Sequence, residues 1–186
     1  MKTITLLIMF SFIGSQCYTT NDVVGDYIYN KRVTNEIRIT DKNAERYTQC
    51  IYKYSDKYGL DPILIARQIY KESRFKHTAS NKWGAFGPMQ VRVKFWKHVL
   101  YRIDNGDLGK YLLSRATIDH SRYFKRIGYG IESGCYIMSH ASKKYKSYPL
   151  ALVSYWTGGS SDIFKRAVND SDYLNNLHYV KDIIND

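Results

Sequence analysis

Hydrophobic residues recur at helical spacing along most of the chain after residue 43. The clearest stripe runs over residues 44–58, and Gly59 is expected to end that helix. Further helical patterns, the last with Ser171 as its expected cap, occupy residues 94–102, 131–145, 149–155, 163–168 and 173–184. No internal repeat or low-complexity run interrupts them. The pattern predicts a mainly α fold.

Residues 61–73 form the most informative of the predicted helices. Asp61 can cap the first turn, and Pro62 suits the first helical position, where a missing N–H costs nothing. Glu72 falls on the same side of this helix as three apolar residues: Ile65, Ala66 and Ile69. Burial disfavours the charged form of a carboxyl group, so an acid on this side can stay protonated near neutral pH and act as a general acid. From helix position alone, the favoured interpretation of Glu72 is a surface carboxylate or one half of a salt bridge, because most helical glutamates are solvated.

A loop is expected at residues 74–91, directly after this helix. It contains Gly84 and Gly87, which allow a backbone to approach a ligand closely. The loop ends in the segment Gly87-Pro88-Met89-Gln90. Farther along the chain come Ser154-Tyr155-Trp156-Thr157-Gly158 and Tyr179-Val180. Each of these segments is weak evidence on its own, whereas their order along the chain is informative.

Taken in order, four segments resemble the soluble lytic transglycosylase (SLT) type of lytic transglycosylase, in the lysozyme-like superfamily. They are Glu72-Ser73, the Gly-x-Met-Gln at 87–90, a variant of Ala-Tyr-Asn-x-Gly at 154–158, and Tyr179-Val180. The resemblance covers roughly residues 44–184. It implies a mainly α, α+β lysozyme-like fold: a single compact helical domain with a substrate cleft, spanning residues 44–186.

The resemblance also implies a reaction. Peptidoglycan would be cleaved at the MurNAc-β-1,4-GlcNAc bond with formation of 1,6-anhydro-MurNAc, for cell-wall remodelling or local opening of the wall. Glu72 would be the catalytic acid and then the base. The implied substrate-binding residues are Ser73, Ser80, Met89, Gln90, Tyr155 and Tyr179, with Met89 and Gln90 lining the cleft and Tyr179 packed near Glu72. Neither a metal nor a cofactor is expected.

Three residues depart from the family's usual motifs. Ser154 stands where the family usually has Ala, Trp156 where it has Asn, and Pro88 where it commonly has Leu. Trp156 is compatible with two interpretations: its ring stacks on a sugar, or it points into the core. The hydrogen bonds of the usual asparagine are lost or replaced in either case.

The glutamate count bears on the mechanism. Most glycosidases use two carboxyl groups. The chain has only four glutamates, Glu36, Glu45, Glu72 and Glu132, and Glu72 alone lies in one of the motifs. A single-acid mechanism, in which the substrate supplies the nucleophile, fits this count. Two alternatives stay open: a lysozyme-type hydrolase that uses water, and a non-catalytic basic module that binds wall polymer or nucleic acid.

The net charge of +11 favours an anionic partner, such as nucleic acid, acidic lipid or an acidic wall polymer. The five histidines are isolated, without the spacing of metal ligands. Peptidoglycan glycan strands are the expected partner, and an export signal argues against nucleic acid. Such domains also serve secretion, conjugation and phage-entry machines, and the sequence leaves that setting open.

Residues 1–17 have the pattern of a signal peptide. Lys2 is followed by an apolar run at 4–13, shorter than the ~20 residues that span a bilayer. We expect an exported protein of the periplasm or cell envelope. The alternative is a lipoprotein anchored to the membrane through Cys17, although Gln16 is a poor residue before a lipid-modified cysteine. Residues 18–43 are expected to be an N-terminal leader, either flexible or extended along the domain.

Two cysteines lie within the predicted domain. Cys50 and Cys135 each fall on an apolar helical stripe. A disulfide and two separately buried thiols explain this pattern equally well in an exported protein. The segment Asp104-Asn105-Gly106-Asp107 is expected to be a plain turn.

Overall fold

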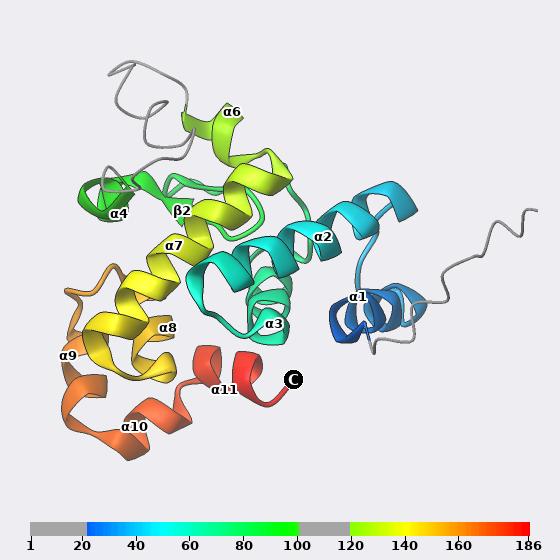
Figure 1. Cartoon of the computed structure of the whole chain (residues 1–186). Coiled ribbons are helices and arrows are strands. Elements are labelled where there is room, and N and C mark those ends of the chain that lie inside the picture. The colour runs from blue at the N-terminus through cyan, green and yellow to red at the C-terminus, as the bar shows by residue number, and fades with distance from the viewer. Residues whose placement is uncertain (1–21, 101–119) are drawn as a thin grey trace, which may run out of the picture.

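The computed structural model describes residues 22–100 and 120–186, most of which are helical (Figure 1). The helices are α1 (Val23–Val33), α2 (Asp41–Tyr58), α3 (Pro62–Ser73), α4 (Val93–Leu100), α6 (His120–Phe124), α7 (Ile127–Tyr145), α8 (Tyr148–Thr157), α9 (Asp162–Asn169), α10 (Ser171–Asn176) and α11 (His178–Ile184). Two short antiparallel strands, β1 (Ala85–Phe86) and β2 (Val91–Arg92), form a sheet. The predicted mainly α class is confirmed.

Local sequence signals determine where α2 and α3 end and begin. These two helices precede the motif loop, residues 74–91. Gly59 adopts a left-handed conformation, with φ of 65°, and ends α2 as predicted. The Asp61 carboxylate accepts a hydrogen bond of 3.0 Å from the backbone N–H of Ile63, and Pro62 opens α3. The start of α3 is therefore set by its own residues, and this fixes where its last turn, with Glu72, falls.

The C-terminal region differs from the sequence prediction in two ways. Residues 173–184 form two helices, α10 and α11, which are separated at Leu177, where the backbone is extended. The cap of α10 is Asp170, whose carboxylate accepts a hydrogen bond of 2.8 Å from the backbone N–H of Tyr173. Ser171, the predicted cap, is the first residue of the helix. Asp170 and Ser171 are both good capping residues, so the pattern could not separate them.

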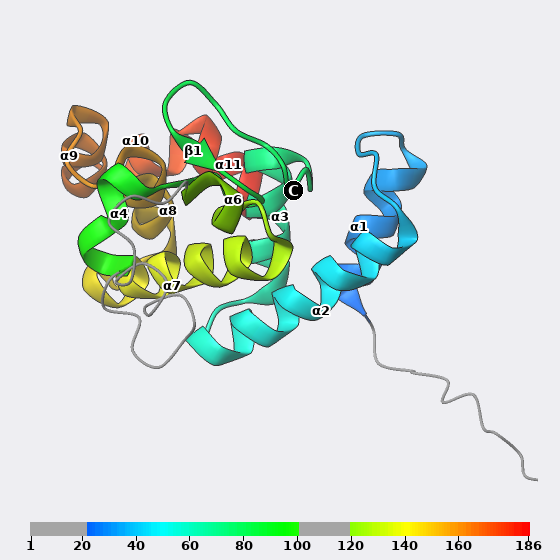
Figure 2. The same ribbon diagram turned by 90° about the horizontal axis from the view of Figure 1, so that it is seen from above.

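Helix α7 forms the centre of the core. It packs against α2 on one side and α8 on the other (Figures 1 and 2). Met89, in the motif loop, is fully buried against α7. A Cβ atom at Gly134 of α7 would lie 2.2 Å from the Met89 sulfur, so this glycine leaves the space that the methionine fills. The motif loop is thereby anchored on the central helix.

In the described part of the predicted leader, residues 22–43, the chain forms α1 and begins α2 at Asp41, where an extended or flexible segment was expected. The Asp22 carboxylate accepts a hydrogen bond from the backbone N–H of Gly25 and caps α1. Val24 and Ile28, four residues apart, are both buried against the rest of the domain. Helix α1 packs on α2 and α3, at the end of the molecule opposite α9 (Figures 1 and 2). The predicted signal peptide 1–17, with Cys17, and the turn at 104–107 lie outside the described residues.

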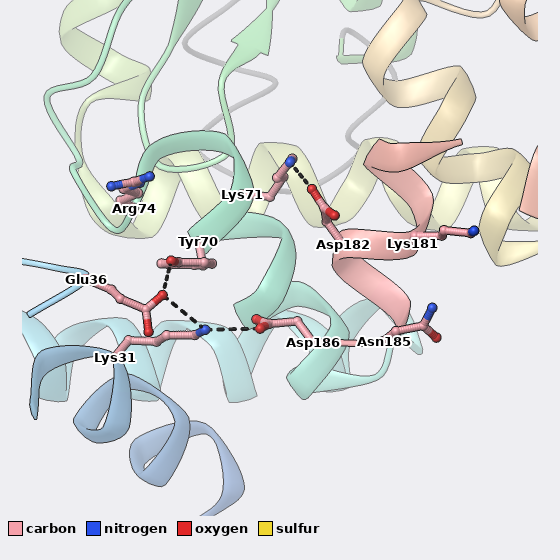
Figure 3. A pocket seen from close by; sticks show the side chains of 9 residues that line it. All are labelled: Lys31, Glu36, Tyr70, Lys71, Arg74, Lys181, Asp182, Asn185 and Asp186. Atoms are coloured by element: carbon pink, nitrogen blue, oxygen red, sulfur yellow. Dashed lines mark hydrogen bonds and ion pairs between the residues drawn. The ribbon is translucent and has the colours of Figure 1, made fainter. Parts of the chain in front are cut away.

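A charged pocket of about 610 Å³ is lined by residues of α1, α3 and α11 and by their flanking residues (Figure 3). Lys71 of α3 forms an ion pair with Asp182 of α11 across it. None of the residues predicted for the active site lines this pocket. This ion pair connects α11 to α3, the helix that carries Glu72.

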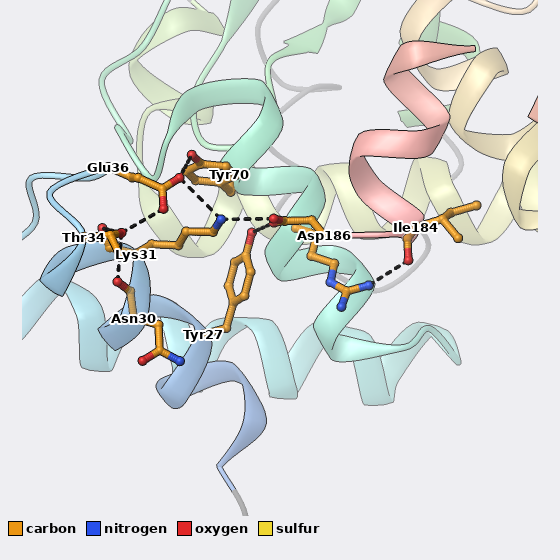
Figure 4. Close-up of polar contacts among 9 residues, drawn as sticks. Tyr27, Asn30, Lys31, Thr34, Glu36, Tyr70, Ile184 and Asp186 are labelled. Atoms are coloured by element: carbon orange, nitrogen blue, oxygen red, sulfur yellow. Dashed lines mark hydrogen bonds and ion pairs between the residues drawn. The ribbon is translucent and has the colours of Figure 1, made fainter. Parts of the chain in front are cut away.

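Residues at the two ends of the described chain meet beside α3 (Figure 4). Lys31 of α1 contacts Asp186 at 3.0 Å and Glu36 at 3.4 Å. Tyr27 donates a hydrogen bond to Asp186, and Tyr70 of α3 donates one to Glu36. This network holds α1 and the residues after α11 against the same helix.

The two cysteines of the described residues are separate thiols. Cys50 is half-buried and Cys135 is fully buried, and both are free. Burial raises the pKa of the Cys135 thiol well above its ordinary value. The disulfide interpretation is therefore wrong for this structure. None of the helices in residues 22–100 and 120–186 has the length and apolar character that crossing a membrane requires.

Candidate active site

Glu72 lies in the last turn of α3, at a pocket of about 420 Å³. Arg74 adopts a left-handed conformation, with φ of 50°, which ends the helix and turns the chain into the motif loop. The loop, β2 and the end of α8 complete the pocket. Its lining residues are Glu72, Asn81, Trp83, Ala85, Gln90, Arg92, Tyr155, Trp156, Thr157 and Ser161.

The Glu72 carboxyl is held by a tyrosine from the C-terminal helix. The Tyr179 hydroxyl donates a hydrogen bond of 2.5 Å to Oε1 of Glu72. Burial and the nearby Glu72 raise the pKa of Tyr179 well above its ordinary value, so its hydroxyl keeps its proton and acts as a donor. The sequence placed Tyr179 near Glu72, and the structure brings the two side chains into direct contact.

Burial sets the acidity of Glu72. Its side chain keeps some contact with solvent, but protein surrounds it closely enough that desolvation raises its pKa to about 7. The hydrogen bond from Tyr179 and the positive charges of Arg92 and Lys71 act in the opposite direction. With a pKa near 7, both the acid and the carboxylate are accessible at neutral pH, which suits a group that first donates and then accepts a proton.

Tyr155 links α8 to the motif loop. Its buried hydroxyl donates a hydrogen bond of 2.6 Å to the backbone oxygen of Met89. Its ring stacks on Trp96 of α4, with centroids 6.2 Å apart. Tyr155 also lines the pocket beside Glu72. It therefore fixes one wall of the pocket relative to the loop that forms another.

The remaining predicted residues divide into two groups. Gln90 lines the pocket, and its side-chain amide donates a hydrogen bond of 2.9 Å to the oxygen of Gly87. Ser73 donates a hydrogen bond back to the oxygen of Ile69 within α3, and Ser80 is exposed outside the pocket lining. The predicted substrate contacts of these residues stay predictions.

Met89 does not lie where the sequence analysis expected it. We expected its side chain to line the cleft, but the side chain is fully buried and is absent from the pocket lining. The reason is the space that Gly134 leaves on α7, which the methionine fills. Met89 contributes to the site through its backbone oxygen, the acceptor for Tyr155.

Several lining residues escaped the sequence analysis, notably Arg92, Trp83 and Asn81. The Asn81 side chain accepts hydrogen bonds from the backbone N–H groups of Trp83, at 2.9 Å, and Ala85, at 3.2 Å, and so shapes the loop. The Trp83 side chain is left 73% exposed at the pocket. The one sequence signal that could have identified these residues was their short distance along the chain from the motif Gly87–Gln90.

Trp156 stands where the family usually has asparagine. Its side chain is not buried in the core, and its ring contacts another side chain. The residue is 37% exposed and lines the pocket. Its ring stacks on Tyr179, with centroids 5.2 Å apart and planes 13° from parallel. The aromatic residue at this position therefore contacts the tyrosine that binds Glu72.

The described residues lining the pocket include one carboxylate, Glu72, and one cation, Arg92. The other three glutamates have partners elsewhere: Glu132 forms an ion pair of 2.7 Å with Lys57, Glu36 accepts a hydrogen bond from Tyr70, and Glu45 accepts one of 3.1 Å from Gln49. Glu132 is thus a buried acid with a structural partner. In residues 22–100 and 120–186, no group of three or more His, Cys, Asp or Glu side chains is placed to hold a metal ion.

A mainly helical domain with one acid of raised pKa in an aromatic-lined pocket is consistent with a lysozyme-like class of protein. A family model described as the transglycosylase SLT domain matches residues 49–176, more than half of the chain. The chain belongs to this family, which acts on peptidoglycan, and the resemblance seen in the motifs is confirmed. A comparison with solved structures finds no significant match.

Proposed function

We propose that this protein is a peptidoglycan lytic transglycosylase that cleaves the MurNAc-β-1,4-GlcNAc bond and leaves 1,6-anhydro-MurNAc. Membership of the SLT family supports transglycosylase activity on peptidoglycan in general. The observation that favours the anhydro product is that Glu72, with a pKa of about 7, is the one carboxyl group among the described residues that line the pocket. In residues 22–100 and 120–186, no second carboxylate lines the pocket for a mechanism that uses two.

The reaction then uses one side chain twice. Protonated Glu72 donates its proton to the glycosidic oxygen while the N-acetyl oxygen of the substrate attacks the anomeric carbon and displaces the leaving sugar. The Glu72 carboxylate next removes the proton of the C6 hydroxyl, whose oxygen attacks the anomeric carbon and releases the N-acetyl group. Glu72 ends protonated, as it began, and no water is consumed.

Two neighbours support the carboxylate between these steps. The hydrogen bond from Tyr179 and the positive charge of Arg92 both favour the ionised form of Glu72. Gln90 and Tyr155 line the same pocket and are proposed to contact the sugar, as are Ser73 and Ser80 by the family resemblance. Trp83, exposed at the pocket, offers a flat aromatic surface of the kind that packs on sugar rings.

Mass spectrometry of fragments from purified cell wall tests the reaction type. We expect anhydro ends, each lighter by one water than the corresponding reducing end. Reducing ends would support the lysozyme-type hydrolase instead. Wall that is bound without any release of fragments would support the non-catalytic basic module, and binding to duplex DNA that weakens steeply with salt would reveal a phosphate-binding surface.

We also propose that the protein is exported to the periplasm or cell envelope, on the strength of the signal-peptide pattern at residues 1–17. The expected result is a mature protein lacking about these residues, seen in the intact mass of material from the envelope fraction. A lipid-sized mass increase on Cys17 would establish the lipoprotein alternative, and an unprocessed N-terminus in the cytoplasm would refute export.

A further inference from the structure

Trp156 occupies the last turn of α8, where the backbone is held from two sides. Arg92 of β2 donates a hydrogen bond to the backbone oxygen of Trp156, and its guanidinium lies 4.5 Å from the centroid of the Phe95 ring. Gly158 then ends the helix with φ of 80° and packs so tightly that an added Cβ would lie 2.9 Å from the Phe95 ring. The position of the tryptophan is therefore fixed independently of Tyr179.

Tyr179 is less firmly held by its own helix. It is the second residue of α11, a helix of seven residues whose first residue follows the extended Leu177 without a side-chain cap. A helix this short contributes little stability of its own, so packing must hold it in place. The Trp156 ring covers the Tyr179 ring at a centroid distance of 5.2 Å, at the point where α8 and α11 meet.

The two aromatic rings and the acid form a continuous chain of contacts. Trp156 stacks on Tyr179, and the Tyr179 hydroxyl donates to Glu72. We propose that Trp156 is a positioning residue, which keeps the Tyr179 hydroxyl on Glu72 by stacking against the tyrosine ring. The activity consequences of this role rest on the proposed function, whereas its effect on Glu72 itself does not.

The direction of that effect follows from the groups around Glu72. Burial raises its pKa, and Tyr179 of α11, Arg92 of β2 and Lys71 of α3 lower it. Tyr155 of α8 also faces the acid, as a neutral phenol. Without the stack, the hydrogen bond from Tyr179 weakens and one of the stabilising contributions to the carboxylate is lost. The pKa of Glu72 then rises, and the alkaline pH at which acid catalysis is lost rises with it.

The experiment is a titration of glutamate carboxyl carbons by NMR, in protein labelled with ¹³C at glutamate. The chain has only four glutamates, so the spectrum has four carboxyl signals, and the one that disappears in Glu72→Gln is assigned to Glu72. We expect Trp156→Leu to raise the Glu72 midpoint by about one pH unit, the size expected for losing a hydrogen bond to a charged group. Trp156→Phe, which keeps an aromatic ring, is expected to titrate close to wild type.

Tyr179→Phe tests the middle of the chain of contacts. It keeps the stacked ring and removes the donor, so it should raise the Glu72 midpoint at least as far as Trp156→Leu does. Adding Trp156→Leu to Tyr179→Phe should then produce no further shift, because the hydrogen bond through which Trp156 acts is already gone. Additive shifts, or a wild-type midpoint in either single variant, would overturn the proposal.

Trp83→Ala is the matched control. Trp83 lines the same pocket, and no ring contact with Tyr179 is seen for it. Its loss is expected to raise KM while leaving the Glu72 midpoint and the pH profile of kcat unchanged. An upward midpoint shift in Trp83→Ala as large as that in Trp156→Leu would show that the shift does not depend on contact with Tyr179, and would reject the positioning role. The titration needs no substrate. A wild-type protein that fails to digest cell wall would therefore contradict the proposed function and leave the positioning role of Trp156 to be decided by the titration.

Discussion

Replacing Glu72 with Gln is expected to reduce peptidoglycan cleavage by about 10²–10⁴-fold, the usual contribution of a positioned acid–base group. The amide keeps the shape of the side chain but can neither donate the proton to the glycosidic oxygen nor accept one from the C6 hydroxyl. Release of soluble fragments from purified wall measures the loss. Wild-type rates in this variant would remove Glu72 from the mechanism.

The same substitution is expected to leave the fold intact and to stabilise it at alkaline pH. The folded-state pKa of Glu72, about 7, lies above the ordinary glutamate value of 4.5. The folded protein thus binds the proton more tightly than the unfolded chain, and Glu72 costs stability as pH rises from about 4.5 through 7. We expect Glu72→Gln to raise the free energy of unfolding by ~1–2 kcal/mol at pH 8, after allowance for partial solvent contact, with no difference at pH 4. Denaturant unfolding at both pH values checks this.

Gly87→Ala is expected to destabilise the protein by ~2–4 kcal/mol and to displace the motif loop. Gly87 has φ of 78°, and a Cβ atom there would lie 1.9 Å from the backbone oxygen of Phe124. The strain of a left-handed alanine therefore adds to a clash with a main chain that cannot rotate away. Denaturant unfolding measures the loss of stability, and wall digestion should fall because Gln90 and the Met89 oxygen move with the loop.

Gly84→Ala provides the control within the same loop. Gly84 also has a left-handed backbone, with φ of 73°, but nothing lies within 4 Å of an added Cβ. Only the conformational strain remains, so the expected loss of stability is ~1 kcal/mol. Equal losses in the two variants would show that the contact with Phe124 is not what makes Gly87 necessary.

The sequence predicted the helices whose ends carry their own signals. Gly59, Asp61 and Pro62 determine the end of α2 and the start of α3 by local backbone chemistry, and they do so in the structure. Helix α1 was missed because its apolar residues do not gather on one face: Val24 and Ile28 are buried, whereas Val23, Tyr29 and Val33 are exposed. It gains its stability from packing on α2 and α3. The break at Leu177 was missed for a similar reason, since apolar spacing continues across it.

Part of the candidate site could be predicted because its motifs are short and local. Glu72 and Gln90 meet at one pocket, and Tyr179 reaches the acid from 107 residues farther along the chain. The stack of Trp156 on Tyr179 and the approach of Arg92 depend on how α8, α11 and β2 meet, which no local pattern contains. Met89 was misplaced because a motif shows which residue is present and not which of its atoms faces the ligand.

The hydrogen bond between Tyr179 and Glu72 has a consequence for where a working catalytic unit ends. The family match stops at residue 176, two residues before α11 begins. A fragment cut at that boundary would keep the acid and every lining residue of the pocket, yet would lose the phenol that contacts the acid and the ion pair between Lys71 and Asp182. The smallest piece of this chain that preserves the environment of its acid therefore extends past the family boundary, through the final helix.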